Sequence, residues 1–349
     1  ELYATLNAEY KLPIPSDLEE RALGKRSIEL PVKMSVSLRK DSPVIDFDVH
    51  VDNVGKSHRL CVVFDADLVS KVNIADEQFG AIERENVHKK EMALYNAALE
   101  RSKTVKEEVN NDLPLNFQQS DTTWQEPPIS IEPTQSFVSL SNSERGIALI
   151  PQGVREYEVI DDHAIRLTLF RTYSFMGKEN LIYRPGRASG ERIIETRDAE
   201  LQKPLDFSFG FTTFAGDFNS AHIANTAKAY NTPVVAREYS EFLNGRLIFS
   251  EPEVEGTKED SYSLFSTENK LVVSAIKKAE DKDGYIIRLY NGQFHKEESD
   301  TLVFTQNIKK AYYVDLKEEY ADSIEVVDNT IQVKPLTHCK FTTIYVETE

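Results

Sequence analysis

Apolar and polar residues alternate along most of this chain, with the period of two that is typical of β-strands. Three such runs follow one another between Ser27 and Leu68, separated by turn signals at Asp41–Pro43 and Asn53–Ser57. In the middle run, Phe47 and its apolar neighbours occupy one face, while aspartates and His50 occupy the other. The pattern predicts an antiparallel meander with one buried face.

Two segments break the alternation and predict helices. From Glu91 to Asn110, apolar residues recur at intervals of three and four, beginning at Met92, which indicates a helical insertion of at most about five turns. Ser220–Tyr230 is the second predicted helix, with Asn219 or Ser220 as its N-cap.

The acidic run Ser250–Asp260 lacks any periodicity and is the best candidate for a domain boundary. Beyond it, short strands recur every 8–15 residues with turns such as Asp281–Gly284, which is typical of a β-sandwich. We therefore predict an all-β fold in two domains. Residues 1–249 form the larger one, which carries the helical insertion near 91–110, and residues 250–349 form a smaller β-sandwich.

Composition supports this fold class and limits the classes of molecule that the protein could bind. The 349 residues include 18 Phe and 15 Tyr against 3 Met and 1 Trp, a bias toward residues that suit pleated, half-buried surfaces. The formal net charge of -17 argues against a nucleic acid or an anionic membrane as partner, because both need clustered Lys and Arg. A neutral sugar fits better.

Cys61 and Cys339 stand far apart in two β-like runs, so neither a disulfide framework nor a thiolate metal site is indicated. No apolar run approaches the roughly 20 residues of a membrane span, and the charged opening lacks a signal-peptide core. A reduced, cytoplasmic setting is the default expectation. The chain begins with Glu rather than Met, which hints at a fragment.

Metal and catalytic motifs are missing from the sequence. None of the seven histidines pairs at helical spacing, and only His50, between Asp48 and Asp52 on a strand face, could hold a cation; such acidic faces are usually just solvated. Glu156 and Glu158 share a strand face, but nothing marks them as the paired carboxylates of a glycosidase. We assign no catalytic residue and no metal ligand to this chain.

Features suited to sugar binding are scattered arginines and one aromatic site: Arg84, Trp124 with Gln125, Arg155, Arg171 and Arg187. For each arginine, a structural ion pair in an acidic protein is the competing interpretation, and Trp124 is more often a core anchor than a stacking platform. Counting by twos along Ala164–Phe175 places Arg171 on the same face as Leu169. A charge at the end of an apolar face must be paired or line a cleft, which makes Arg171 the best candidate.

Four blocks in order resemble the C-terminal β region of glycoside hydrolase family 38, the bacterial α-mannosidases and mannosylglycerate hydrolases. They are Asp65–Glu85, Trp124–Val159, Ala164–Gly190 and Leu271–Asn291. The resemblance implies a β supersandwich like galactose mutarotase, followed by a smaller sandwich. It also implies a retaining mechanism in which an aspartate and a zinc ion act from an N-terminal barrel, and neither maps onto a residue here. Arg171 and Arg84 are the positions that fit contacts near the substrate. The helical insertion is longer than the family's usual connection.

Three hypotheses follow. The first is the non-catalytic half of an α-mannosidase or mannosylglycerate hydrolase, with the barrel of the same polypeptide and a carbohydrate as partners and with homodimer formation left open. The second is a free-standing carbohydrate-binding or structural β protein. The third, an aldose epimerase, rests on the mutarotase-like fold alone, which does not establish function.

Overall fold

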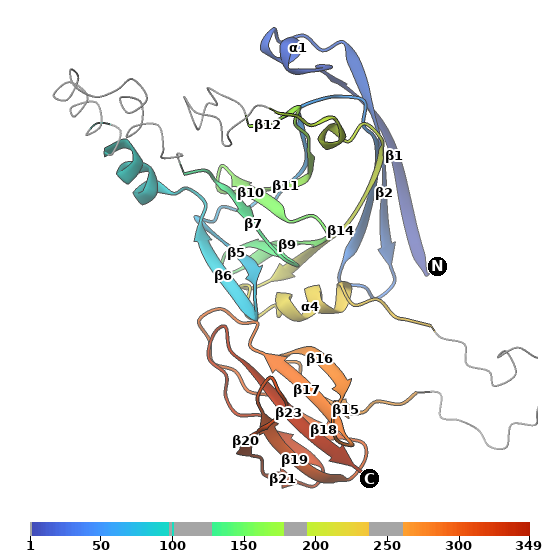
Figure 1. Cartoon of the computed structure of the whole chain (residues 1–349), viewed down its shortest axis with the longest axis vertical. Coiled ribbons are helices and arrows are strands. Elements are labelled where there is room, and N and C mark those ends of the chain that lie inside the picture. The colour runs from blue at the N-terminus through green and yellow to red at the C-terminus, as the bar shows by residue number, and fades with distance from the viewer. Residues whose placement is uncertain (1, 98–99, 101–127, 178–193, 237–260) are drawn as a thin grey trace, which may run out of the picture. The chain divides into compact units, whose positions relative to one another are not determined.

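A computed structural model describes residues 2–97, 100, 128–177, 194–236 and 261–349. Strands dominate it, so the predicted all-β fold is confirmed (Figure 1). The chain divides into two compact units. The first comprises Glu1–Glu77 and Ile82–Ala221, and the second comprises Gln78–Ala81 and His222–Glu349. The boundary predicted at residue 250 falls within 237–260, outside the described residues.

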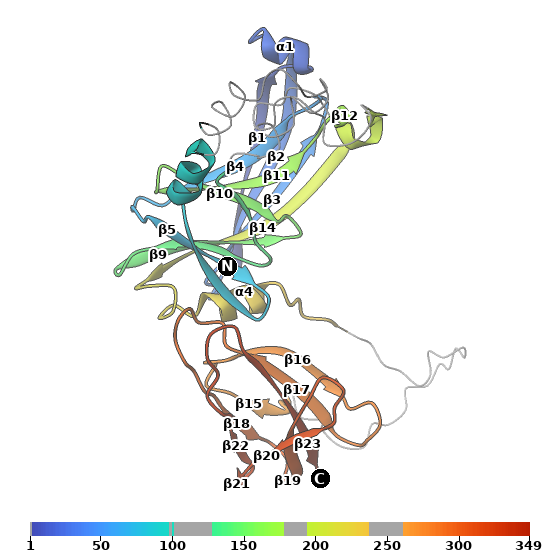
Figure 2. The same ribbon diagram turned by 60° about the vertical axis from the view of Figure 1, so that its left-hand side comes forward.

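The first unit is built on two sheets. The larger has eight strands in the order β1-β2-β3-β14-β9-β8-β5-β6, and the smaller has four in the order β4-β11-β10-β7. Figure 2 labels β4, β10 and β11 of the smaller sheet and β1, β2, β3 and β14 of the larger one. The larger sheet contains β1 (Tyr3–Ile14), β2 (Ile28–Arg39), β3 (Ile45–Asp52), β5 (Val72–Glu77), β6 (Gly80–Glu85), β8 (Val138–Ser141), β9 (Arg145–Gln152) and β14 (Pro204–Ala215). The smaller contains β4 (Arg59–Asp65), β7 (Ile131–Pro133), β10 (Glu156–Ile160) and β11 (Ala164–Arg171).

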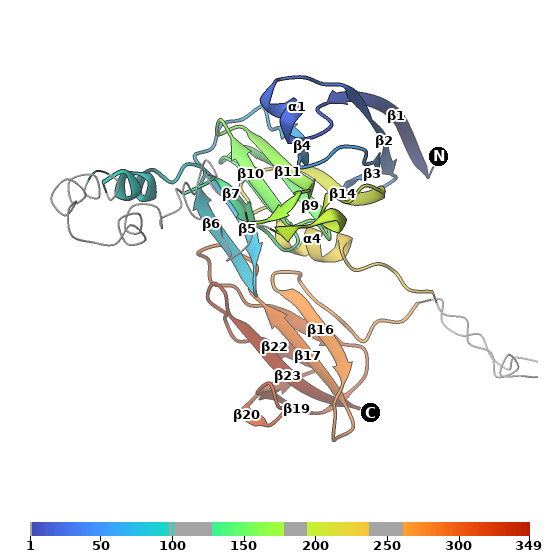
Figure 3. The same ribbon diagram turned by 45° about the horizontal axis from the view of Figure 1, so that its top comes forward.

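The core of this unit lies between the facing apolar sides of the two sheets. The ring of Phe64 on β4 packs edge-on against Phe47 on β3, with centroids 5.2 Å apart, and stacks on Phe211 of β14 at 5.0 Å. Val51 on β3 is fully buried, so the face assigned to this strand from its alternation is confirmed. Figure 3 shows β7, β10 and β11 of the smaller sheet in green and the β1–β2 hairpin in blue.

The predicted meander is only half correct. Strands β2 and β3 pair antiparallel as expected, but β4 leaves for the other sheet and pairs with β11. Alternation reports which side chains a strand buries, and a strand with one apolar face can satisfy that requirement in either sheet of a sandwich. The partner of β4 was therefore not encoded in the pattern that predicted it.

Helices are few among the described residues. Residues 89–97 are helical, in agreement with the start of the predicted insertion, and residues 101–110 lie outside the description. Helix α1 (Leu18–Ala22) begins after Asp17, whose carboxylate accepts a hydrogen bond from the Glu20 amide.

Helix α4 (Ile223–Tyr230) confirms the second predicted helix, but its predicted N-cap is wrong. The cap is His222, whose backbone has a φ of 49° and whose side chain makes no capping hydrogen bond. Ser220 lies in the preceding turn, where its amide donates to Asp217 Oδ1. Ser220, the predicted cap, is therefore part of a local turn that the Asp217 side chain closes, and it does not cap the helix.

The remaining elements are short. In the first unit, β12 (Phe175–Met176) and β13 (Ile194–Glu195) form a two-stranded ribbon, followed by the 3-10 helix η1 (Arg197–Glu200). The second unit has a four-stranded sheet, β15-β18-β22-β21, and a five-stranded sheet, β16-β17-β23-β19-β20. These strands are β15 (Phe265–Ser266), β16 (Val272–Lys278), β17 (Tyr285–Tyr290), β18 (Thr301–Phe304), β19 (Ile308–Val314), β20 (Tyr320–Ser323), β21 (Val326–Val327), β22 (Thr330–Gln332) and β23 (Phe341–Thr348).

The predicted turn at Asp281–Gly284 joins β16 to β17 and uses a left-handed glycine, with φ 126° at Gly284. Cys61 and Cys339 do not form a disulfide; Cys61 lies in β4, whereas Cys339 lies in a turn before β23 rather than in a strand. None of the helices in the described ranges is long and apolar enough to cross a membrane.

Candidate functional site

The outer face of the smaller sheet carries a chain of alternating charges across three strands. Arg171 Nη2 lies 3.2 Å from Glu156 Oε1, and the same oxygen lies 3.6 Å from Arg59 Nη1. Arg59 Nη2 donates to Glu158 Oε1 at 2.7 Å, and Arg166 Nη1 donates to the same oxygen at 2.5 Å. We call these five residues the charge chain. It brings together Arg171 and the two glutamates that the sequence placed on one strand face.

The face predicted for Arg171 is wrong. The register between β11 and β4 shifts between Thr168 and Phe170, which marks a β-bulge. Leu169 and Phe170 are both buried, so the alternation steps by one residue and Arg171 emerges on the outer face with Thr168. Its side chain is 50% exposed, so an arginine predicted at the edge of the core is a surface group with one ion pair.

Electrostatics decide what the glutamates of this face can do. Burial opposes ionisation of Glu158, but the hydrogen bonds from Arg59 and Arg166 outweigh it and lower the pKa of this carboxyl. A carboxylate held ionised by two guanidinium groups cannot donate a proton to a leaving group near neutral pH. Glu156 also accepts a hydrogen bond from Thr168, at 2.8 Å, besides its contacts with arginines. The chain is therefore suited to binding and support rather than to acid catalysis.

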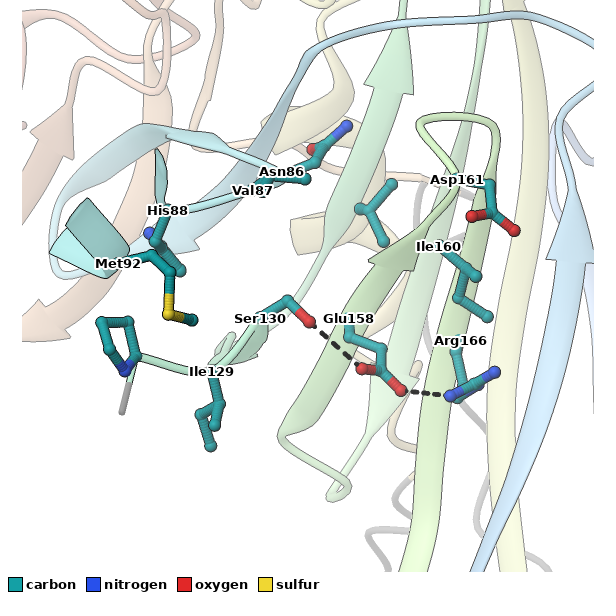
Figure 4. Close-up of a pocket in the computed structure, with 12 residues that line it drawn as sticks. Asn86, Val87, His88, Met92, Ile129, Ser130, Glu158, Ile160, Asp161 and Arg166 are labelled. Carbon is teal, nitrogen blue, oxygen red and sulfur yellow. Dashed lines mark hydrogen bonds and ion pairs between the residues drawn. The ribbon is translucent and has the colours of Figure 1, made fainter. Parts of the chain in front are cut away.

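A pocket of about 340 Å³ lies at the Arg166 end of the charge chain (Figure 4). The hydrogen bonds that Glu158 accepts from Arg166 and Ser130 form one side of it. Its remaining lining combines an aliphatic wall with polar groups: Asn86, Val87, His88, Met92, Pro128, Ile129, Val159, Ile160 and Asp161. Among the described residues of this lining, only His88 has a ring on which a sugar could stack.

A second hollow, of about 550 Å³, lies at the Arg171 end and is lined by Arg155, Glu156, Arg171, Asp206 and others. Arg155 is exposed, and its guanidinium forms no ion pair with any described residue. The hollow therefore presents two arginines beside two carboxylates. Planar guanidinium groups can donate in pairs to neighbouring hydroxyls or to a carboxylate, so this end of the chain is the better candidate for contact with a polar ligand.

Arg84 lies elsewhere and is almost enclosed. Only 11% of its side chain is exposed. Nη1 donates to the Pro133 carbonyl at 2.9 Å and to the Tyr157 hydroxyl at 3.0 Å, while Nη2 donates to Glu77 at 2.8 Å. Arg84 Nε is also 3.6 Å from Glu132 Oε2. These partners occupy its donors, so the structure gives this residue a supporting role at the edge of the sheet.

The histidines form pairs rather than a metal site. His50 Nδ1 lies 2.7 Å from Asp206 and its Nε2 lies 3.4 Å from Asp52. The hydrogen bond to Asp206 raises the pKa of His50. His88 Nε2 lies 2.9 Å from Glu132, a His–Glu pair that sequence spacing did not reveal, but that glutamate also faces Arg84. Among the described residues no three His, Cys, Asp or Glu side chains converge to hold a metal ion.

Sequence reasoning also missed Glu200, which is buried at the base of the β12–β13 ribbon. Its carboxylate accepts from the Ser57 amide at 2.6 Å, from the Ser57 hydroxyl at 3.1 Å and from the Ser174 hydroxyl. Its main-chain carbonyl accepts from Asn53 Nδ2 at 2.9 Å. No local signal marks Glu200, because its partners come from loops that are distant in sequence. Trp124, Gln125 and Arg187 lie outside the described residues.

Two family models match the chain in order. Residues 7–176 match the glycosyl hydrolases family 38 C-terminal domain, and residues 270–337 match the family's C-terminal beta sandwich domain. A curated protein of Halalkalibacterium halodurans, described as a putative mannosylglycerate hydrolase, is 22% identical over 312 residues. That match covers 89% of this chain and 28% of the relative.

Solved structures show the same fold. A glycosyl hydrolase family 38 protein and an α-mannosidase, both from Enterococcus faecalis, match 99% of this chain with TM-scores of 0.68 and 0.67 and identities of 18% and 19%. The matched parts are 35% and 33% of those chains. The chain thus spans about a third of the length of these proteins. It belongs to the C-terminal region of glycosyl hydrolase family 38.

Proposed function

We propose that this chain is the non-catalytic C-terminal half of a family 38 α-mannosidase that hydrolyses α-mannosides or mannosylglycerate with retention of configuration. The observation that carries the proposal is the ordered match to both C-terminal models of one glycosidase family. The rest of the polypeptide then supplies the reaction. In the terms of the resemblance, an N-terminal barrel provides an aspartate nucleophile and zinc.

The chemistry of the described face supports this division of labour. A retaining glycosidase needs one free carboxylate as nucleophile and one protonated carboxyl as acid, about 5–5.5 Å apart. Here the lowered pKa of Glu158 removes a proton donor, and arginines engage both Glu156 and Glu158. Among the described residues no three His, Cys, Asp or Glu side chains gather that could hold a zinc ion.

Within this role, Arg171 is the residue that we assign to the substrate side. It is half exposed, lines the hollow that also holds Arg155, and keeps donors beyond the single contact with Glu156. A guanidinium pair of this kind suits vicinal hydroxyls of a sugar, or the carboxylate of a glyceryl group. Arg84, in contrast, has its donors engaged within the protein.

The test compares this 349-residue chain with the whole polypeptide encoded by its gene, each supplied with zinc. Release of aryl alcohol from an aryl α-mannoside and of mannose from mannosylglycerate is measured for both proteins. Activity confined to the whole polypeptide is the expected result. Activity in the chain alone would contradict the non-catalytic role, and inactivity of both, with mannose bound by the chain, would favour a free-standing binding protein.

A further inference from the structure

The hairpin formed by β1 and β2 has two chemically different faces. Facing residues on one side are joined by polar contacts, with Thr5 Oγ1 2.8 Å from Ser37 Oγ and Ser35 Oγ 2.7 Å from Asn7 Oδ1. The ion pair of Lys11 with Glu29, at 3.5 Å, continues that side. These pairs are typical of a surface that faces water.

The opposite side of the same hairpin is apolar along its whole length. Register places Leu6 against Val36, Tyr10 against Val32, and Ala4 against Leu38. At one end this side enters the core, where Leu12 and Ile14 pack against buried residues. Toward the other end it is uncovered, because Leu6 is 69% exposed, Leu38 51% and Tyr10 45%.

The covering sheet ends before it reaches this part of the hairpin. Its last strand is β4, and no other strand of the described residues pairs with the free edge of β4. The core-directed residues Leu60, Val62 and Phe64 on β4 are only half-buried, which is expected for a strand with an open flank. Strands β1 and β4 are the edge strands on the same side of the two sheets, because β4 packs against β3 and β14. The apolar side of β1 and the free edge of β4 thus form one unfinished border of the sandwich.

We propose that this border, comprising Ala4, Leu6, Ala8, Tyr10 and Leu38 with the free edge of β4, is the docking surface for the N-terminal part of the same family 38 polypeptide. The inference rests on the proposed function, which gives the chain such a part. In the two solved structures, about a third of each chain matches 99% of this one. The other two thirds of such a polypeptide are available to pack on the border. A contiguous exposed apolar face, opposite a polar face on the same hairpin, marks a site of contact with another part of a protein.

The test is hydroxyl-radical footprinting with mass spectrometry, applied to the 349-residue chain and to the whole polypeptide. Tyr10 is the reporter, with Leu6 and Leu38 beside it. Tyr3 is the matched control, because it lies on the polar side of the same strand and is 68% exposed. We expect the oxidation rate of Tyr10 to fall on the order of tenfold in the whole polypeptide, as for a residue removed from solvent, relative to that of Tyr3.

Equal Tyr10 rates in the two proteins, after normalisation to Tyr3, would overturn the proposal. Protection of Tyr10 in the 349-residue chain alone, increasing with protein concentration, would also overturn the proposal. That result would show that a second copy of the chain, not the N-terminal part, packs on the border. Mannosidase activity of the whole polypeptide is recorded on the same preparation. Loss of the proposed function appears there as inactivity, whereas failure of the docking surface appears only in the footprint.

Discussion

Arg171 and Glu156 face each other across neighbouring strands at 3.2 Å on the outer side of the smaller sheet. The contact exists because the bulge between Thr168 and Phe170 turns Arg171 away from the core. An exposed ion pair of this kind contributes about 0–1 kcal/mol to stability. The protein therefore does not need Arg171 in order to fold. A loss of activity when Arg171 is substituted then reports on function rather than on stability.

Arg171→Ala in the whole polypeptide is expected to lower kcat/KM for an α-mannoside by roughly 10- to 100-fold, the cost of one lost charge-assisted hydrogen bond at a binding site. The melting temperature should change little. Steady-state kinetics and thermal unfolding of the same preparation measure both quantities.

Arg145→Ala is the matched control for that experiment. Arg145 is also an exposed arginine of the first unit, with 58% of its side chain accessible, and it pairs with the exposed Asp67. Its removal should leave kcat/KM unchanged. If Arg171→Ala behaves like this control, Arg171 has no role at the substrate.

Arg84→Ala is expected to act on stability instead. The substitution removes the guanidinium from Glu77 and the Tyr157 hydroxyl in a nearly enclosed site and leaves Glu132 with His88 alone, at a cost of about 3–5 kcal/mol. Urea unfolding of the chain measures this loss, and Arg84→Lys should recover part of it by restoring the charge. A variant as stable as the parent would show that Arg84 does not support the sheet edge.

The contrast between these arginines shows what sequence could predict. Strand positions followed from alternation, and β3 buries Val49 and Val51 as expected, with Phe47 partly buried on the same face. The face of Arg171 could not be predicted from alternation, because a β-bulge adds one residue to the strand. No Gly or Pro at Thr168–Phe170 indicates this bulge in the sequence. Strand β1 was not predicted either. Its apolar residues alternate with polar and charged residues, and the N-terminal segment was interpreted only as charged.

Glu200 yields a prediction about the β12–β13 ribbon. Glu200→Gln removes the charge that accepts from Ser57 and Ser174, so the base of the ribbon should open more often. We expect the Thr196 amide, which donates to the Ser174 carbonyl, to exchange its hydrogen on the order of tenfold faster. Glu195→Gln, in the same ribbon but exposed, should leave that rate unchanged. Equal rates in both variants would contradict the anchoring role.

The candidate site itself was only partly accessible to sequence reasoning. Glu156 and Glu158 were correctly placed on one strand face, but Arg59 belongs to a strand whose partner could not be predicted. The charge chain joins residues about 100 positions apart, so no spacing along the sequence encodes it. Pairs such as His88 with Glu132 have the same origin, because strand order rather than distance along the chain brings them together.

Asp76 provides a test through pH. This residue lies on β5, is 7% exposed, and accepts a hydrogen bond from Ser136 Oγ at 2.5 Å. Burial raises the pKa of its carboxyl from 3.8 to about 6, against the hydrogen bond from Ser136. The folded protein therefore holds the proton more tightly than the unfolded chain does. Its contribution to stability is complete below about pH 4 and is lost as the pH rises through 6.

Asp76→Asn removes this titration while keeping an acceptor for Ser136. Compared with the parent, the variant should gain up to about 3 kcal/mol of unfolding free energy at pH 8, and much less at pH 4, where both side chains are neutral. Urea unfolding at the two pH values measures the difference. An equal effect at both pH values would show that the substitution acts through packing, because only a buried ionising carboxyl makes the gain depend on pH.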